Sequence, residues 1–267
     1  MHGHTILPTA SVYKIFLLVE LFRERELGNL DLSETMSLSD EDKSPGTGVL
    51  YSMTSGLTLN LHDLAVLMIS ISDNTASDML WRRLNTSHQL DELICRLGLK
   101  DTHIRGTSRE LITSIYRRPV NLGESSEEYF RNAHVTKESL PYINGMKGNS
   151  SSACDISRML QLMVTGDCFQ ADTRELLVKM LCLCQSTARI PKYLPPTVIT
   201  AHKTGSVDRI TNDVGIVFTE KGAYVITMLY NGNLSTPEEY DANRNRVISE
   251  EMLASISRDV YQVYIQK

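Results

Sequence analysis

Three short polar motifs stand in a fixed order along this chain, and each falls in a different kind of predicted element. Ser-x-x-Lys occupies positions 11–14, Ser-Asp-Asn positions 72–74 and Lys-Thr-Gly positions 203–205. The first opens a predicted helix, the second joins two predicted helices and the third lies in a predicted strand. Each motif alone carries little information. A fold that uses all three must bring a helix start, an interhelical loop and a strand to one point.

The first motif opens a long helix. Apolar residues repeat at helical spacing from Ile15 to Phe22, and Gly28 is a typical stop signal. A serine and a lysine three positions apart share one face of a helix, so the Lys14 amine can reach the Ser11 hydroxyl. A lysine acts as a base only when burial or nearby cations lower its pKa. We interpret Ser11 as a nucleophile and Lys14 as its base. The alternatives are an N-cap serine and a solvated lysine.

The second motif follows a predicted helix over 57–71 and precedes another helix. Ser72 is a candidate for passing a proton to a leaving nitrogen, and the Asn74 amide is a candidate for binding a substrate carbonyl. Asp73 is expected to hold the loop by accepting hydrogen bonds from backbone N–H groups. The alternative for the tripeptide is a helix-capping turn.

The third motif lies in a β-branched run over 198–207, which predicts a strand. The Ser206 N–H could stabilise an oxyanion together with the Ser11 N–H. Lys203 and Thr204 would supply a cation and a hydroxyl to a substrate carboxylate, and Gly205 would permit close approach. The alternative is an exposed edge strand.

An arginine is a further candidate for the substrate carboxylate. A guanidinium offers two parallel donors to that group. Arg189 precedes the third motif and Arg209 follows its strand, so both are candidates. The alternative for either is a solvated surface arginine.

Together, the motifs resemble those of penicillin-recognising serine hydrolases, nearest to the class A β-lactamase-like branch. The spacing of the first two motifs, and the stretches 42–50 and 212–217, also resemble that branch. The resemblance implies an α+β fold in which an antiparallel sheet flanked by helices stands beside an all-helical lobe. We expect one domain over 1–267, with a helical lobe at about 29–196 and an α/β lobe at about 1–28 and 197–267.

Three parts of the chain depart from that branch. Its members carry a loop glutamate in a Glu-x-x-Leu-Asn pattern, which is absent, and Glu110 is the nearest substitute. Glu110 either activates the deacylation water or is a surface residue at a helix start. The polar stretch 115–152 predicts an insertion that acts as a lid, a substrate-selecting wall or a surface loop. Only ten residues precede Ser11, so we expect the initial helix and strand pair to be missing, or their sheet edge to be covered by another segment.

Composition limits the kinds of molecule that this protein is expected to bind. A net charge of −5 and a pI near 5.8 argue against nucleic acid. No run approaches the ~18 apolar residues that a membrane span needs. Among five cysteines, Cys182-x-Cys184 is interpreted as helix packing rather than metal binding, and we expect no metal, no cofactor and a monomer. The resemblance suggests a periplasmic or secreted protein, although residues 1–4 carry no signal-peptide pattern.

Three functional hypotheses follow. The first is hydrolysis of a β-lactam through a Ser11 acyl-enzyme, at a slow rate because the usual glutamate pattern is missing. The second is a DD-peptidase-like amidase or esterase acting on a peptidoglycan-like substrate. The third is a degenerate domain that is acylated and serves as a sensor.

Overall fold

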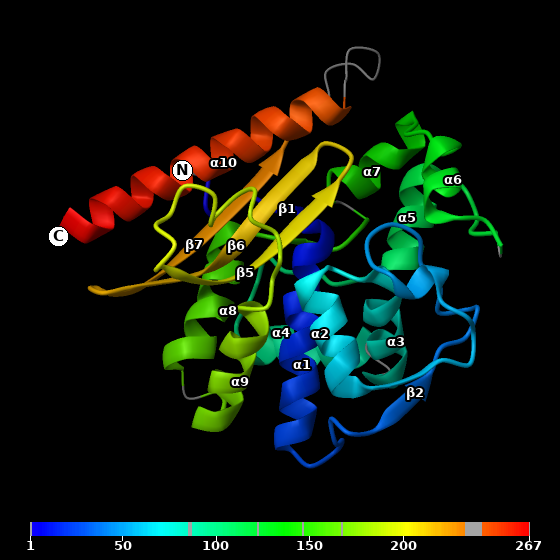
Figure 1. The fold of residues 1–267 in the computed structure, drawn as a ribbon, viewed down its shortest axis with the longest axis horizontal. Coiled ribbons are helices and arrows are strands. Elements are labelled where there is room, and N and C mark those ends of the chain that lie inside the picture. The colour runs from blue at the N-terminus through cyan, green and yellow to red at the C-terminus, as the bar shows by residue number, and fades with distance from the viewer. Residues whose placement is uncertain are drawn as a thin grey trace.

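The computed structural model describes residues 2–84, 87–121, 123–145, 147–166, 168–232 and 242–266. An antiparallel sheet with helices on both faces stands beside a helical lobe, which confirms the expected α+β architecture (Figure 1). The longer helices apart from the last are α1 (Lys14–Glu26), α2 (Leu61–Ser70), α3 (Asn74–Leu84), α4 (Ser87–Arg96), α5 (Ser108–Tyr116), α8 (Ala153–Thr165) and α9 (Ala171–Leu181).

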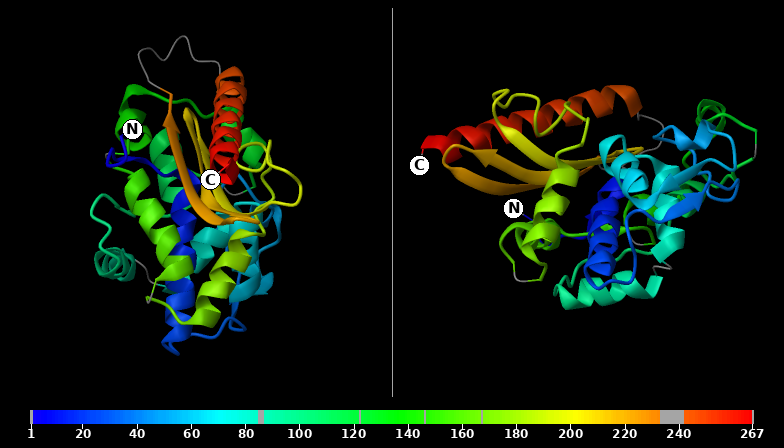
Figure 2. Two further views of the ribbon diagram at one scale, coloured as in Figure 1. Left: turned by 90° about the vertical axis from the view of Figure 1, so that its left-hand side faces the viewer. Right: turned by 60° about the horizontal axis from the view of Figure 1, so that its bottom comes forward.

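The sheet consists of β5 (Ile199–Val207), β6 (Ile210–Thr219) and β7 (Gly222–Asn231) in that order. Each strand is rich in β-branched and aromatic residues, which pack well on a pleated surface. The last helix, α10 (Ala242–Gln266), crosses one face of the sheet, while α8 and α9 lie against the other (Figures 1 and 2). The sequence over 237–265 predicts one helix here, and of that range residues 237–241 lie outside the described residues.

Helix α1 runs through the centre of the molecule. It follows a short 3-10 turn, η1 (Ala10–Tyr13), and the chain leaves it at Gly28, which has a φ of +76°. The prediction of a helix ending there is therefore confirmed. The apolar spacing predicted a helix buried along one face, whereas every residue from Lys14 to Phe22 is buried. Glu20 is fully buried and accepts two hydrogen bonds from Arg23, at 2.8 Å each.

The polar stretch 115–152 carries regular structure rather than only surface loop. It contains α6 (Ser126–Arg131), the turn η3 (Lys137–Ser139), α7 (Leu140–Ile143) and β4 (Ser150–Ser151). β4 pairs with β1 (Leu7–Pro8), and the ring of Phe130 packs edge-on against Tyr116 at 5.3 Å between centroids. The remaining short elements are β2 (Thr35–Ser37), η2 (Leu50–Ser52) and β3 (Thr58–Asn60).

Among the helices that the structure describes, none is long and apolar enough to cross a membrane.

Candidate active site

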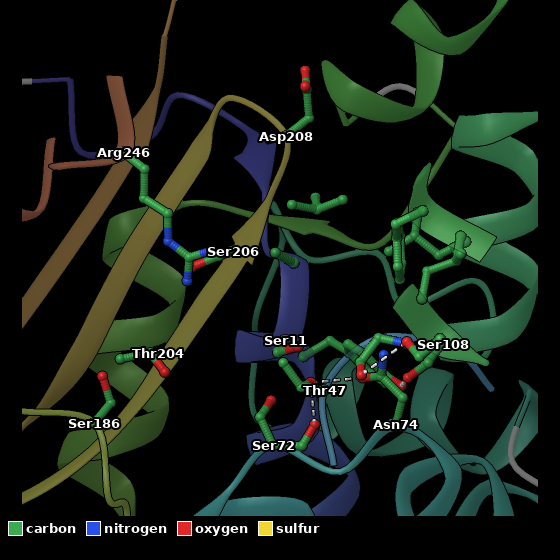
Figure 3. Close-up of a pocket in the computed structure, with 18 of the residues that line it drawn as sticks. Ser11, Thr47, Ser72, Asn74, Ser108, Ser186, Thr204, Ser206, Asp208 and Arg246 are labelled. Atoms are coloured by element: carbon green, nitrogen blue, oxygen red, sulfur yellow. Dashed lines mark hydrogen bonds between the residues drawn. The ribbon is translucent and has the colours of Figure 1, made fainter. Parts of the chain in front are cut away.

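A cavity of about 410 Å³ lies where the helical lobe meets β5 (Figure 3). All three sequence motifs contribute to its lining, as does the stretch 115–152. The lining side chains used below are those of Ser11, Thr47, Ser72, Asn74, Ser108, Ser126, Glu127, Phe130, Ser186, Arg189, Thr204, Ser206, Asp208, Arg246 and Glu250. The helix start, the interhelical loop and the strand therefore meet at one point.

Lys14 connects the first motif to the second. Its Nζ donates to the Asn74 Oδ1 at 2.8 Å, to the Ser72 backbone oxygen at 2.6 Å and to the Ser72 Oγ at 3.2 Å. Lys14 is fully buried, and Ser11 lies in the 3-10 turn just before it. The amine is thus fixed by the loop, and the Lys14 backbone lies three residues after Ser11.

The surroundings of Lys14 favour its neutral form. Burial lowers the pKa of its amine well below the usual value, and the nearby charge of Lys203 lowers it further. The carboxylates of Asp78 and Asp73 oppose this shift without cancelling it. An amine that is partly neutral can take a proton from a hydroxyl, as the sequence interpretation of Lys14 requires.

The Ser-Asp-Asn loop is held rigidly. Asp73 Oδ2 accepts from the backbone N–H groups of Val49 and Leu50 at 2.7 and 3.0 Å, and its Oδ1 accepts from Ala76 at 2.9 Å. The predicted role of Asp73 is confirmed. Ser72 adopts a left-handed conformation, with a φ of +60°, that non-glycine residues rarely adopt. The loop therefore fixes the Ser72 hydroxyl beside Lys14.

Thr47 also lines the cavity, although the sequence analysis did not name it individually. Its Oγ1 donates to the Ser72 backbone oxygen at 2.7 Å and approaches the Asn74 Oδ1 at 3.4 Å (Figure 3). Asn74 in turn donates to the Pro45 backbone oxygen at 2.8 Å. Thr47 belongs to the stretch 42–50, whose resemblance to the class A branch gave no role to an individual residue.

Strand β5 lies directly against the backbone of Thr9 and Ser11. A Cβ atom on Gly205 would lie 2.6 Å from the Thr9 oxygen and 3.1 Å from the Ser11 nitrogen, so only glycine fits. Lys203 is fully buried and donates to the Thr204 backbone oxygen at 2.9 Å. Burial lowers the pKa of Lys203 to about 8, although the nearby charges of Cys184 and Asp213 raise it.

Arg189 and Arg209 have surroundings that the sequence did not predict. Arg189 is 2% exposed and donates to the Asn212 backbone oxygen at 2.5 Å, to Ser206 Oγ at 2.5 Å and to Glu250 Oε1 at 3.0 Å. Most of the Arg189 N–H donors are occupied by acceptors of the protein itself, so this side chain ties β5 to β6. Arg209 is also buried, beside Asp208 at 3.5 Å. Neither is a solvated surface arginine.

Arg246 also lines the cavity, although the sequence analysis did not name it as a candidate. It lies in the first turns of α10, its side chain is 56% exposed, and Figure 3 shows it pointing toward Ser206. Its Nε lies 3.3 Å from Glu250 Oε1. Nothing local in the sequence distinguishes Arg246 from other helix arginines, because its place depends on how α10 crosses the sheet.

Glu110 does not line the cavity that holds Ser11. Its carboxylate accepts from the Thr107 backbone N–H at 2.9 Å, and the Thr107 hydroxyl accepts from the Glu110 N–H at 3.1 Å. This reciprocal pair caps α5, and Glu110 lines a separate hollow beside Arg105 and Lys147. The placement gives no support to Glu110 as the residue that activates water.

Ser108 instead faces the cavity at the start of α5. Its Oγ lies 2.9 Å from the Tyr13 hydroxyl, and its backbone N–H donates to Asp78 Oδ1 at 2.7 Å. The Arg109 backbone N–H donates to the other Asp78 oxygen at 2.9 Å. Burial raises the pKa of Asp78 to about 7, although these hydrogen bonds and Lys14 act to lower it. Asp78 therefore anchors the start of α5 against the helical lobe.

Helix α6 forms one wall of the cavity. Ser126 Oγ accepts from the Gly46 N–H at 2.7 Å, which fastens α6 to the loop before Thr47. Glu127 and Phe130 also line the cavity, from the same short helix. Of the three alternatives for the stretch 115–152, this geometry favours the substrate-selecting wall.

Solved structures of similar shape define the class of fold. A β-lactamase from Sphaerobacter thermophilus matches with a TM-score of 0.77 and 25% identity, over 98% of this chain and 85% of that one. The structure of PBP-A matches with a TM-score of 0.77 and 22% identity, over 99% and 84%. The fold is therefore that of β-lactamases and transpeptidases.

The sequence comparison is more specific about the family. The chain belongs to the β-lactamase enzyme family, whose model matches residues 1–264. The β-lactamase regulatory protein BlaB of Streptomyces cacaoi is 23% identical, over 80% of this chain and 73% of that protein. The extended-spectrum β-lactamase PER-1 of Pseudomonas aeruginosa is 21% identical, over 97% and 76%.

Proposed function

We propose that this protein is a serine hydrolase that β-lactams acylate at Ser11 and that releases the acyl group slowly. Neutral Lys14 takes the Ser11 hydroxyl proton as the oxygen attacks the carbonyl carbon of the lactam. The N–H groups of Ser11 and Ser206 stabilise the oxyanion. When the C–N bond breaks, Ser72 passes a proton from Lys14 to the leaving nitrogen. The 3.2 Å distance between Lys14 Nζ and Ser72 Oγ supports that relay.

Binding of the substrate carboxylate is assigned to the β5 side of the cavity. Thr204 and Ser206 supply hydroxyls and Arg246 supplies positive charge at the cavity lining. Lys203 adds positive charge from its fully buried position in β5. Arg189 acts through Ser206, because its guanidinium donates to the Ser206 hydroxyl and holds it in place. Asn74 would bind the acyl carbonyl on the opposite side, with the donor hydrogen that Pro45 leaves free.

The proposal that the acyl group is released slowly rests on one observation about the carboxylates around the cavity. Among the described lining residues, the Asp and Glu side chains are Glu127, Asp208 and Glu250. Glu127 pairs with Arg131 at 2.8 Å, Asp208 with Arg209 at 3.5 Å and Glu250 with Arg189 at 3.0 Å. A carboxylate engaged by a guanidinium has fewer oxygen lone pairs left to hold a water molecule for attack on the acyl group. Ser108, which faces the cavity from α5, has no basic group.

The same observation favours a second candidate, a DD-peptidase-like amidase or esterase. A long-lived acyl-enzyme can transfer its acyl group to an amine or alcohol instead of water. The charge and shape of the cavity suit an acyl amide with a carboxylate at one end, whether cyclic or linear.

Mass spectrometry of the intact protein, mixed with a simple penicillin and sampled over time, tests the proposal. We expect an adduct of the full penicillin mass on the wild type that persists after free drug is removed, and no adduct on Ser11→Ala. An adduct on folded Ser11→Ala, or none on the wild type, would overturn it. Rapid loss of the adduct with release of penicilloate would show efficient β-lactam hydrolysis instead.

A further inference from the structure

One part of the cavity lining is apolar, and the proposed mechanism gives it no role. Its side chains come from α5, from α6 and from the last residue of β5. Together they form the apolar end of the cavity, which consists of Leu111, Ile112, Tyr116, Phe130 and Val207.

The side chains of the apolar end form one continuous surface. The Phe130 ring packs edge-on against Tyr116, with 5.3 Å between centroids. Leu111, Tyr116 and Val207 pack against the same small hydrophobic core. Ile112 is buried, whereas the other four are only half-buried, so part of each still faces the cavity. A surface of this kind suits the apolar part of a ligand, because binding removes both from water.

Gly46 shows where the apolar end lies relative to the acyl carbonyl. A Cβ atom on Gly46 would lie 2.6 Å from Asn74 Nδ2. The same Cβ would lie 3.7 Å from both Ile112 Cδ1 and Phe130 Cζ, so the three side chains meet around one point. Asn74 is assigned to the acyl carbonyl, and the substituent on that carbonyl therefore begins beside Ile112 and Phe130.

Helix α6 holds Phe130 in this position. The Gly46 N–H donates to Ser126 Oγ at 2.7 Å, and Ser126 Oγ lies 3.3 Å from the Gly46 backbone oxygen. Just before the helix, the Glu124 backbone oxygen accepts from the Tyr51 hydroxyl at 2.9 Å. Both contacts tie α6 to the segment 46–51, so the ring belongs to a fixed wall.

We propose that the apolar end binds the side chain of the substrate's acyl group, and that Phe130 favours acyl groups that carry an aryl ring. The assignment rests on the proposed function and specifies which acyl groups suit it. Aromatic pairs prefer edge-to-face or offset contacts. The Phe130 atom nearest to Gly46 is Cζ, at the edge of the ring, so the face of a substrate ring can pack against it.

Three groups of the substrate then bind at separate places. Figure 3 shows Asn74, assigned to the acyl carbonyl, across the cavity from Ser206 and Arg246, assigned to the carboxylate. The aryl ring binds at a third place, beside Asn74. The cavity of about 410 Å³ lies within the ~300–1,000 Å³ of small-molecule sites. A ring held there raises the acylation rate, because it keeps the lactam carbonyl against Ser11.

Two penicillins that differ only in a phenyl ring test this assignment. Benzylpenicillin carries a phenylacetyl group, and its acetyl analogue carries a methyl group in place of the benzyl group. We expect Phe130→Ala to slow acylation by benzylpenicillin about tenfold and acylation by the acetyl analogue less than about twofold. Phe130→Leu keeps an apolar side chain and should give an intermediate rate. Mass spectrometry of the intact protein over time gives each rate.

The acetyl analogue distinguishes contact with the ring from a general effect on the wall. Equal slowing with both penicillins would mean that Phe130 only supports the fold, and it would overturn the assignment. A benzylpenicillin rate that Phe130→Ala does not change would overturn it too. The matched control is Tyr193→Ala, which removes an exposed ring that contacts Glu251 and should change neither rate.

Binding without acylation separates this assignment from the proposed function. Isothermal titration calorimetry of Ser11→Ala measures the Kd of each intact penicillin. Benzylpenicillin should bind about tenfold more tightly than the acetyl analogue, and adding Phe130→Ala should remove the difference. If this difference is found but the wild type is not acylated, the proposed function fails and the apolar end stands. If the wild type is acylated but the ring changes neither rate nor Kd, the apolar end alone fails. If neither penicillin binds or acylates, both fail.

Discussion

Replacing Lys14 with alanine tests the mechanism most directly, because the proton of Ser11 has no other acceptor in the proposal. General-base help is worth about 10²- to 10⁴-fold, or about 2.7–5.5 kcal/mol of barrier, so acylation should slow by that factor. The fold should tolerate the change. The Ser72 backbone oxygen keeps the Thr47 hydroxyl as a donor at 2.7 Å, and the same hydroxyl lies 3.4 Å from the Asn74 Oδ1 that loses the amine.

The assay is the single-turnover rate of labelling by a fluorescent penicillin, measured across pH. In the wild type the rate should rise with pH through the lowered pKa of Lys14, because only the neutral amine accepts a proton. Lys14→Ala should lose this rise along with most of the rate. The matched control is Lys192→Ala, which removes a surface lysine that pairs with Glu251 outside the cavity. A folded Lys14→Ala protein that is acylated like the wild type would refute the reasoning.

Three further predictions concern substrate binding and release. Lys203 loses its charge as pH rises through its pKa of about 8, so KM for carboxylate-bearing penicillins should increase above that pH. A KM that does not change would show that Lys203 takes no part in binding the carboxylate. Arg246→Ala should raise the same KM about two- to tenfold, whereas Arg258→Ala, elsewhere on α10, should not. Glu110→Gln should leave the acyl-enzyme lifetime unchanged by mass spectrometry, and a longer lifetime would return Glu110 to the mechanism.

The three motifs could be located from sequence because residue type and short spacing mark each of them. Ser11 and Lys14 lie three residues apart across the junction of η1 and α1, and Ser72 lies two residues before Asn74, the first residue of α3, so local geometry fixes each pair. The resemblance added the order of the motifs and the class of fold. Tertiary structure was needed to bring Lys14 against Ser72 and Asn74, and to bring the strand of Lys203 against them.

Residues whose surroundings depend on long-range packing could not be placed in that way. Glu110 stands at a helix start in the sequence, and a helix start allows either a cap or a catalytic role. Arg189 and Arg246 are both arginines near the cavity, and only the crossing of α10 over the sheet makes one buried and the other exposed.

The burial of α1 has a consequence for how this protein would lose activity. The helix after Ser11 is buried in the main core, so we expect it to open only when the whole domain unfolds. Partial opening of the outer segments would then leave Ser11 in place. In increasing denaturant, the loss of penicillin labelling should coincide with global unfolding, and the backbone amides of α1 should exchange with solvent as slowly as any in the protein.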